Sequence, residues 1–256
     1  MDLAIDIGNS DTVLGVHDGN DWVQIWRMRS LPNEPSLFYD NQIRQFFLDA
    51  GLHGSAFKTL VISSVVPALT AVLKTVTEGL TGLEAVIVGP SVYDTLPVKV
   101  LRPQEIGTDL VANAVAAYHR FGQACVVVDF GTALTFTIVD KRGEIAGVNI
   151  APGLTTAIRA LSGSTAQLPE VPLELPDSVL GKNTVHAIQA GVLWGYVGLV
   201  EYMLRRIKKE MGGKVAVAAT GGLSSILKPL HRSFDYVSPM LTMDGLRLIG
   251  KAAIKV

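Results

Sequence analysis

Two short stretches of the chain place an aspartate between an apolar strand pattern and a glycine turn. In both stretches the acid stands two residues before a glycine, and small residues with hydroxyl or amide side chains lie close by. Burying a carboxylate in a strand is costly unless a cation or hydrogen-bond donors meet it, whereas a glycine turn lets backbone N–H groups approach a phosphate. The pattern therefore predicts two turns that bind the phosphate groups of one charged ligand. The residues are Asp6, Gly8, Asn9 and Ser10 in the first stretch and Asp129, Gly131 and Thr132 in the second.

Each stretch also has a purely structural interpretation. A tight hairpin turn in which the aspartate caps its own backbone uses the same residue types. We favour ligand binding because the pattern occurs twice in one chain.

A third aspartate, Asp109, lies between the two stretches, just before a helical pattern of apolar residues. Aspartate is a favoured N-cap residue, so capping of this helix is one interpretation. The other interpretation makes Asp109 a general base that accepts the proton of an attacking hydroxyl group. The residues alone leave both open.

A strand pattern that runs into Thr220, Gly221 and Gly222 is a third candidate ligand element. Taken with the two turns, it suits the sugar and base of a nucleotide, where a side chain would block approach. The five histidines have no metal-binding spacing, and no Walker-type phosphate loop occurs. Acids at strand ends favour Mg²⁺, which proteins hold largely through water and nucleotide phosphates.

Composition narrows the classes of ligand and location. The 256 residues include 22 Lys and Arg against 23 Asp and Glu, for a formal net charge of -1, so we expect neither a nucleic-acid partner nor a membrane surface. The single cysteine, Cys125, cannot form a disulfide within the chain and heads an apolar strand, where a thiol is usually inert. No run of about 18 uncharged apolar residues occurs. We expect a cytoplasmic protein.

Hydrophobic periodicity predicts the same order of elements twice, with antiparallel hairpins followed by crossover helices. This order is typical of an α/β chain with mixed sheets flanked by helices, here two halves that duplicate one structure around a ligand cleft. Besides the hairpins, strands are expected at 22–29, 60–63, 85–88, 143–150 and 215–219, and helices beginning near residues 40, 67, 111, 153, 185 and 244.

Gly191, Gly195 and Gly198 lie on one face of the long helix expected over 185–211. Each glycine costs about 1 kcal/mol against alanine in a helix interior, so the stripe implies close approach of another backbone. Packing within the chain and a contact between two copies are the alternatives.

The order of these motifs resembles the acetate and sugar kinase, Hsp70 and actin superfamily, and more narrowly the type III pantothenate kinases. The resemblance spans nearly the whole chain and implies two ribonuclease-H-like domains, residues 1–115 and 116–256. It implies ATP-dependent phosphorylation of the primary hydroxyl of pantothenate, the first step toward coenzyme A. Further signatures that it matches stand at residues 63–67, 151–153, 165–169 and 181–184.

The resemblance also implies roles for single residues. Asp6 and Asp129 would organise Mg²⁺ and a monovalent cation, K⁺ or NH₄⁺, around the phosphates of ATP. Asp109 would take the hydroxyl proton, with Gly107, Thr108 and Val65 beside the substrate. Thr184 would reach the substrate bound to the other subunit of a homodimer.

The chain departs from the family pattern beside Asp109. Leu110 stands where the family usually has an arginine that contacts the pantothenate carboxylate, and the segment before it lacks the substrate-contacting tyrosine. A kinase for another small hydroxy acid is therefore one alternative. Two others are a nucleotide-binding accessory or regulatory protein without kinase activity and an actin-like filament protein.

Arg102 could replace the missing positive charge, which gives a first prediction. Losing a charge-assisted partner costs roughly 1.5 to 3 kcal/mol, so Arg102→Ala should raise the apparent KM for pantothenate. Steady-state kinetics measures this, and an unchanged KM would remove Arg102 from the substrate site.

Overall fold

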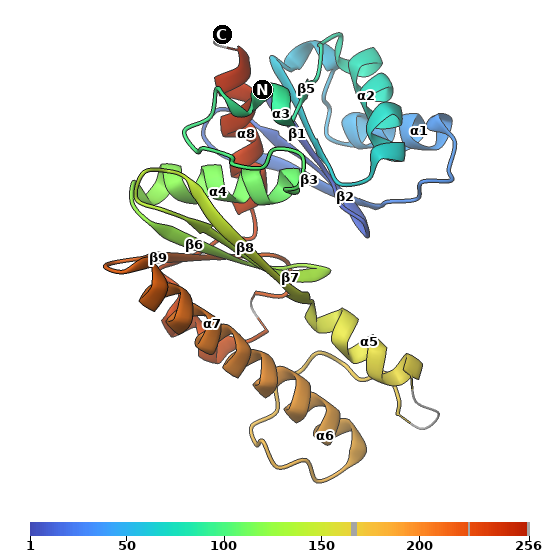
Figure 1. Cartoon of the computed structure of the whole chain (residues 1–256). Coiled ribbons are helices and arrows are strands. Elements are labelled where there is room, and N and C mark those ends of the chain that lie inside the picture. The colour runs from blue at the N-terminus through green and yellow to red at the C-terminus, as the bar shows by residue number, and fades with distance from the viewer. Residues whose placement is uncertain (165–167, 225, 255–256) are drawn as a thin grey trace. The chain divides into compact units, whose positions relative to one another are not determined.

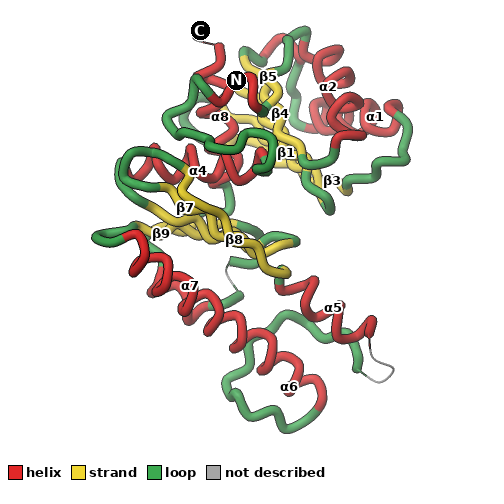
Figure 2. Tube along the Cα trace, viewed as in Figure 1, coloured by secondary structure: helices red, strands yellow, loops and turns green. Residues whose placement is uncertain are grey.

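The computed structural model describes residues 1–164, 168–224 and 226–254, which divide into two compact units (Figure 1). The first unit comprises Met1–Ala116 together with the C-terminal segment from Leu241, and the second comprises Ala117–Met240. Figure 2 shows that each unit contains both strands and helices.

The first unit is built on a five-stranded sheet in the order β3-β2-β1-β4-β5. β1 and β2 form an antiparallel hairpin that continues into β3, while β4 runs parallel to β1 and β5 parallel to β4. The strands are β1 (Asp2–Ile7), β2 (Asp11–His17), β3 (Trp22–Arg29), β4 (Thr59–Ser64) and β5 (Val86–Ile87).

Helices α1 (Ser36–Asp49) and α2 (Pro67–Thr81) bury one stripe each against the first sheet. Tyr39, Ile43 and Phe47 recur at a spacing of four residues and join a buried cluster with the alternating β1 residues Leu3, Ile5 and Ile7. Pro67 suits the first turn of α2, where its missing N–H has no helical partner, and Gly82 ends the helix with φ 72°. The remaining segments are η1 (Gly54–Ala56), α3 (Pro90–Tyr93) and α4 (Thr108–Phe121).

The C-terminal helix α8 (Leu241–Ile254) belongs to the first unit, which corrects the expected second domain of residues 116–256. It packs on β1 and β4. A Cβ on Gly250 would touch the Val61 side chain, whereas the neighbouring β4 residues Leu60 and Ile62 belong to the α1 and α2 cluster. α8 therefore covers the opposite face of the sheet. Its amphipathic pattern shows that it is a helix but not which sheet it covers.

The second unit repeats this sheet topology in the order β10-β9-β6-β7-β8. β6, β7 and β8 form an antiparallel meander, and β9 and β10 extend it in parallel from β6. The strands are β6 (Cys125–Phe130), β7 (Ala133–Val139), β8 (Ile145–Pro152), β9 (Ala216–Thr220) and β10 (Tyr236–Val237). The repeat confirms the expected α/β class with two mixed sheets flanked by helices.

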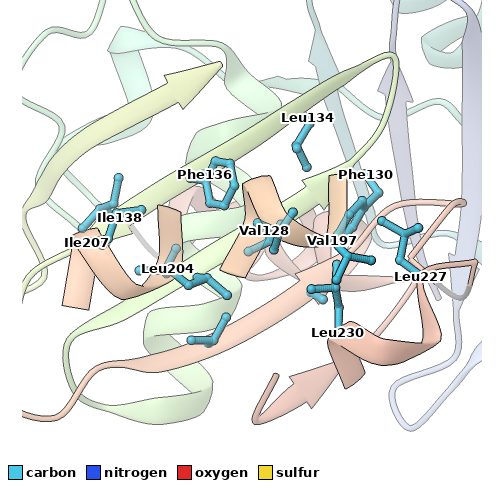
Figure 3. Close-up of a cluster of buried hydrophobic side chains, with 14 of the residues drawn as sticks. Val128, Phe130, Leu134, Phe136, Ile138, Val197, Leu204, Ile207, Leu227 and Leu230 are labelled. Carbon is cyan, nitrogen blue, oxygen red and sulfur yellow. The ribbon is translucent and has the colours of Figure 1, made fainter. Parts of the chain in front are cut away.

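One face of the second sheet is buried under α7 (Gly195–Met211) (Figure 3). Val128, Phe130 and Phe136 from the strands meet Val197 and Leu204 from the helix. Because side chains alternate along a strand, the intervening positions, Asp129 among them, point to the other face. The other segments of this unit are α5 (Leu154–Ser164), α6 (Thr184–Gln189), η2 (Ala190–Trp194) and η3 (Lys228–Ser233).

The expected long helix is observed over Thr184–Met211, with a π-helical stretch, η2, that the periodicity did not predict. By length and composition this helix could cross a membrane, with a mean hydropathy of 1.2 over its most apolar window. The buried stripe of Val197, Val200, Leu204 and Ile207 instead packs against the second sheet. This packing buries 39% of that apolar window.

Candidate functional site

The first predicted phosphate turn follows β1. Asp6 lies one residue before the end of this strand, and the Gly8 N–H donates to the Asp11 carbonyl oxygen at 3.0 Å, which closes the turn into β2. A Cβ on Gly8 would come within 3.0 Å of that same carbonyl oxygen, so a larger residue would push the turn open. Asn9 and Ser10 are exposed at the tip. The turn presents polar groups to solvent, as a ligand-binding turn requires.

The Ser63 hydroxyl binds Asp6 and links it to a second hydroxyl, that of Thr108. The Ser63 hydroxyl donates to Asp6 Oδ1 at 3.0 Å and lies 2.9 Å from Thr108 Oγ1. Thr108 Oγ1 accepts from the Ser64 N–H at 3.2 Å. The structure therefore joins the end of β1, the end of β4 and the first residue of α4. Ser63 was not predicted as a site residue.

Asp109 is the second residue of α4, so it is not the N-cap that its position before the helical pattern suggested. Gly107 precedes the helix, and a Cβ there would collide with Asp109 Oδ1. Burial raises the pKa of Asp109, and the N–H groups of Leu110 and Asp109 oppose this shift less strongly. A carboxylate whose pKa is raised by desolvation is a stronger base than an exposed one, which suits proton abstraction.

Tyr93 lies in the core of the first unit near Asp109. Its hydroxyl is buried and has no hydrogen-bond partner among the described residues. Burial, and secondarily the charge of Asp109, raises the pKa of Tyr93 to about 12, so the phenol stays protonated at neutral pH. This tyrosine was not predicted, because no local pattern distinguishes it from a core aromatic residue.

The second predicted phosphate turn follows β6. Asp129 lies one residue before the end of this strand, and the Gly131 N–H donates to the Ala133 carbonyl oxygen at 3.1 Å. The Thr132 carbonyl oxygen accepts from the Gly153 N–H at 3.0 Å and from the Thr156 hydroxyl at 2.9 Å, both at the start of α5. A Cβ on Gly153 would collide with this turn, which explains the glycine at that position.

Gly221 brings the third candidate element onto Asp129. It has φ 92°, and a Cβ there would lie 2.7 Å from Asp129 Oδ1 and 2.6 Å from the Phe130 carbonyl. Thr220, directly before it, is the register partner of Asp129 across β9 and β6. The structure thus places Thr220, Gly221 and Asp129 together within the second unit.

Two hydroxyl groups without partners flank Asp129. Thr135 on β7 and Thr220 on β9 are both its register partners, so the three side chains share one face of the sheet. The Thr135 and Thr220 hydroxyls are buried and lack a hydrogen-bond partner among the described residues. A buried orphan hydroxyl costs about 1 to 3 kcal/mol, which a bound ligand or cation would relieve.

The donor set at the two acids fits Mg²⁺ or a monovalent cation. Carboxylate and hydroxyl oxygens are hard ligands that suit these ions. The described residues contain no group of three or more His, Cys, Asp or Glu side chains that could hold a metal by itself. This fits an ion that takes its other ligands from water and ATP phosphates rather than one held in an all-protein cage.

The other predicted residues lie outside these two clusters. Val65 donates its N–H to the Ile7 carbonyl oxygen at 3.0 Å beside the first turn, whereas Thr184 is exposed at the first residue of α6. Gly222 follows Gly221, and a Cβ there would meet nothing within 4 Å. Of the signature at residues 165–169, residues 165–167 lie outside the described residues.

Leu110 and Arg102 differ in what they offer a ligand. Leu110 is only 7% exposed and belongs to the apolar core, so its position supplies no charge. Arg102 pairs with Glu105 at 3.1 Å, with both side chains well exposed. An exposed pair of this kind contributes at most about 1 kcal/mol, so Arg102 could exchange Glu105 for a ligand carboxylate at little cost.

Comparison with known proteins identifies one family. The family model for type III pantothenate kinase matches residues 2–206. The chain is 39% identical over 249 residues to the type III pantothenate kinase of Geobacter sulfurreducens, covering 97% of this chain and 98% of that protein. It is 44% identical over 255 residues to that of Treponema pallidum, covering 97% and 93%.

Solved structures share the fold at much lower sequence identity. The ethanolamine utilization protein EutJ from Carboxydothermus hydrogenoformans superposes with a TM-score of 0.58 at 18% identity, over 97% of this chain and 89% of that one. MreB 5 of Spiroplasma citri, bound to AMPPNP, gives a TM-score of 0.53 at 9% identity, over 99% and 96%. These likenesses confirm the expected α/β fold.

Asp109→Asn tests the base. General-base catalysis contributes roughly a hundredfold to ten-thousandfold, so kcat should fall within that range while the fold is kept. Steady-state kinetics and circular dichroism measure both, and turnover within about tenfold of the original chain would exclude this role.

The same variant should be more stable than the original chain at neutral pH. Since burial raises the pKa of Asp109, the folded protein is penalised above that pKa, where the carboxylate must ionise, and the penalty vanishes as pH falls below the unfolded value. The gain in Tm should therefore be present at pH 7 and lost in acid. A gain that persists at low pH would point to another cause.

Gly221→Ala tests the nucleotide element, with Gly147→Ala on β8 of the same sheet as its control. At Gly221 the new Cβ meets Asp129 and the Phe130 carbonyl at a positive φ, a strain of about 1 kcal/mol or more, whereas at Gly147 it meets nothing within 4 Å among the described residues. Gly221→Ala should weaken ATP binding at least tenfold by calorimetry, and Gly147→Ala less than threefold. Equal effects would show that Asp129 does not depend on this contact.

Proposed function

The chain belongs to the type III pantothenate kinase family, and we propose that its own residues carry out the ATP-dependent phosphorylation of pantothenate in the roles below. The observation that carries this proposal is the hydroxyl contact that joins the Asp6 turn to the helix bearing Asp109. Phosphoryl transfer depends mainly on in-line positioning and on neutralising charge, so a rigid link between a phosphate-side acid and a base serves it directly.

Asp109 accepts the proton of the attacking primary hydroxyl. Its raised pKa keeps the carboxylate ready to take a proton. A Cβ at position 107 would collide with Asp109 Oδ1, so the glycine keeps its own side chain off this oxygen. The Thr108 hydroxyl is engaged with Ser63 and Ser64, so Thr108 would contact the substrate through its backbone.

The two glycine turns bind the phosphates of ATP. Asn9 and Ser10 supply donors in the first turn and Thr132 does so in the second, where Gly131 shapes the turn, while Gly221 and Gly222 leave space for the nucleoside. Mg²⁺ and K⁺ or NH₄⁺, held by Asp6 and Asp129 together with those phosphates, would neutralise the charge that develops during transfer. The unpaired hydroxyls of Thr135 and Thr220 support a cation or phosphate beside Asp129.

A homodimer accounts for the glycine stripe on the long helix. A Cβ on Gly191, Gly195 or Gly198 would meet nothing within 4 Å among the described residues, so close packing against those residues does not explain these glycines. A second copy packed on this face would, and it would place Thr184, on the same continuous helix, near a subunit boundary. We accordingly propose a dimeric cytoplasmic enzyme in which Thr184 contacts the substrate of the other subunit.

A second candidate substrate follows from Leu110. Because this core residue offers no cation to a carboxylate, a different small hydroxy acid is the alternative acceptor. Incubation with ATP, Mg²⁺ and K⁺ or NH₄⁺, with pantothenate and a panel of hydroxy acids in separate reactions, distinguishes the two by mass spectrometry. We expect phosphopantothenate as the main product, and phosphorylation of another acid with none of pantothenate would transfer the proposal to that substrate.

Gly195→Leu tests the dimer, with Gly79→Leu in α2 as its matched control. Both glycines are helical, and a Cβ on either meets open space within the chain, so the two changes should affect folding alike. Light scattering should show twice the chain mass of 27.3 kDa for the original protein and the control, and a shift toward the single-chain mass for Gly195→Leu. A monomeric original protein, or a dimeric Gly195→Leu, would contradict the proposed interface.

A further inference from the structure

Ser63 is a polar residue at a position where the strand pattern calls for an apolar one. It follows Leu60, Val61 and Ile62 on β4 and is fully buried, with an exposed fraction of 0%. Its register partner on the parallel strand β1 is Asp6. A hydroxyl is retained in such a place only where its hydrogen bonds offset the cost of burial.

The hydroxyl protons can be assigned by counting donors. A carboxylate only accepts, so the single Ser63 proton goes to Asp6 Oδ1. The Thr108 proton then goes to Ser63 Oγ at 2.9 Å, the shorter of its two contacts, rather than to the Ser64 carbonyl oxygen at 3.2 Å. Thr108 Oγ1 in turn accepts from the Ser64 N–H. The result is a directed chain from the backbone of β4 through Thr108 and Ser63 to Asp6. Such chains polarise each member and strengthen the final bond to the carboxylate.

This series of hydrogen bonds connects Asp6 with the helix that bears Asp109. Thr108 is the first residue of α4, and Asp109 is the next residue along. At the corresponding register position of the second unit, opposite Asp129, the Thr220 hydroxyl has no hydrogen-bond partner among the described residues. A hydroxyl beside the acid is therefore common to both sheets, but the link to a base-bearing helix is made by Ser63.

We propose that Ser63 is a positioning residue for phosphoryl transfer, whose buried hydroxyl fixes the Asp6 carboxylate relative to the first turn of α4 and so relative to Asp109. This inference rests on the kinase function proposed above. Ser63 touches neither substrate nor nucleotide in this role and acts through Asp6 and Thr108.

The stability cost of removing the hydroxyl should be small. Thr108 Oγ1 also lies 3.2 Å from the Ser64 carbonyl oxygen, so in Ser63→Ala its proton has an alternative acceptor. The main effect of Ser63→Ala should therefore be on the orientation of the Asp6 carboxylate and of α4. Misplacement of a catalytic group by about 1 Å can cost a hundredfold in rate, so the rate should respond more than stability does.

The kinetic test is a double-mutant cycle of Ser63→Ala, Thr108→Val and the combination. Ser63→Ala should lower kcat about tenfold to a hundredfold, leave the KM for pantothenate within about threefold, and keep Tm within about 3 °C of a control. The control is Thr77→Val, which removes another fully buried hydroxyl, bonded only within α2. Because Ser63→Ala and Thr108→Val interrupt the same series of hydrogen bonds, the kcat of the double variant should be no more than about twofold below that of the slower single variant.

A second readout needs no activity. The Leu110 and Val111 amides donate to the Gly107 carbonyl oxygen in the first turn of α4, and their hydrogen exchange should be about tenfold faster in Ser63→Ala than in Thr77→Val. Any one of four results would overturn the positioning role. These are an unchanged exchange rate, a kcat of Ser63→Ala within twofold of the original, losses in kcat that multiply in the double variant, or a rise in KM at unchanged kcat. If the original protein phosphorylates no pantothenate, the proposed kinase function is wrong. The hydrogen-exchange result would still show whether Ser63 holds the first turn of α4 in place.

Discussion

The structure depends on the cost of removing a carboxylate from water at the end of a buried strand. Asp6 and Asp129 each stand in a strand whose other residues are almost all buried, and each strand is central in its sheet. Such a group is tolerated only where donors or cations meet it. The first sheet meets this demand through Ser63, which its register places opposite Asp6, whereas the register partners of Asp129 are two hydroxyls without a hydrogen-bond partner among the described residues.

The two units satisfy their acids differently. Opposite Asp6 stands Ser63, whose hydroxyl is fully engaged with Asp6 and Thr108. Opposite Asp129 stand Thr135 and Thr220, whose hydroxyls lack partners among the described residues. One sheet is thus connected through hydroxyl groups to the helix that bears Asp109, whereas the hydroxyls beside Asp129 remain without a hydrogen-bond partner among the described residues.

Much of the fold could be read from the sequence because its determinants are local. Alternating apolar residues and glycine turns gave both hairpins, and Ile43 and Phe47 are visible at a helical spacing, although α1 begins at Ser36, before the expected start near residue 40, and also buries Tyr39. Short segments such as α3 and β10 carry too few residues for a period to show. The unit to which α8 belongs could not be read, because an amphipathic helix specifies an apolar partner surface without identifying it.

Some residues of the candidate site could likewise be predicted from the sequence, and others could not. Asp6, Asp129 and Gly221 stand out because an acid in an apolar strand and a glycine after one are locally unusual. Ser63 has a weak signal, a serine after three apolar strand residues, but its role depends on the register between β4 and β1 and on contact with Thr108. The orphan hydroxyl of Tyr93 depends on packing throughout the first unit and leaves no local trace. Sequence patterns identify residues that are unusual by themselves, and tertiary structure is needed for those whose role is a partnership.

The most direct test of the central claim is the pH dependence of kcat/KM for pantothenate, measured for the original chain and for Asp109→Asn. If a desolvated carboxylate is the base, the original chain should lose activity as pH falls, with a midpoint above the ordinary aspartate value of about 3.9, and the residual activity of the variant should lack that limb. A profile that stays level until the protein unfolds, or the same acid limb in the variant, would contradict the account.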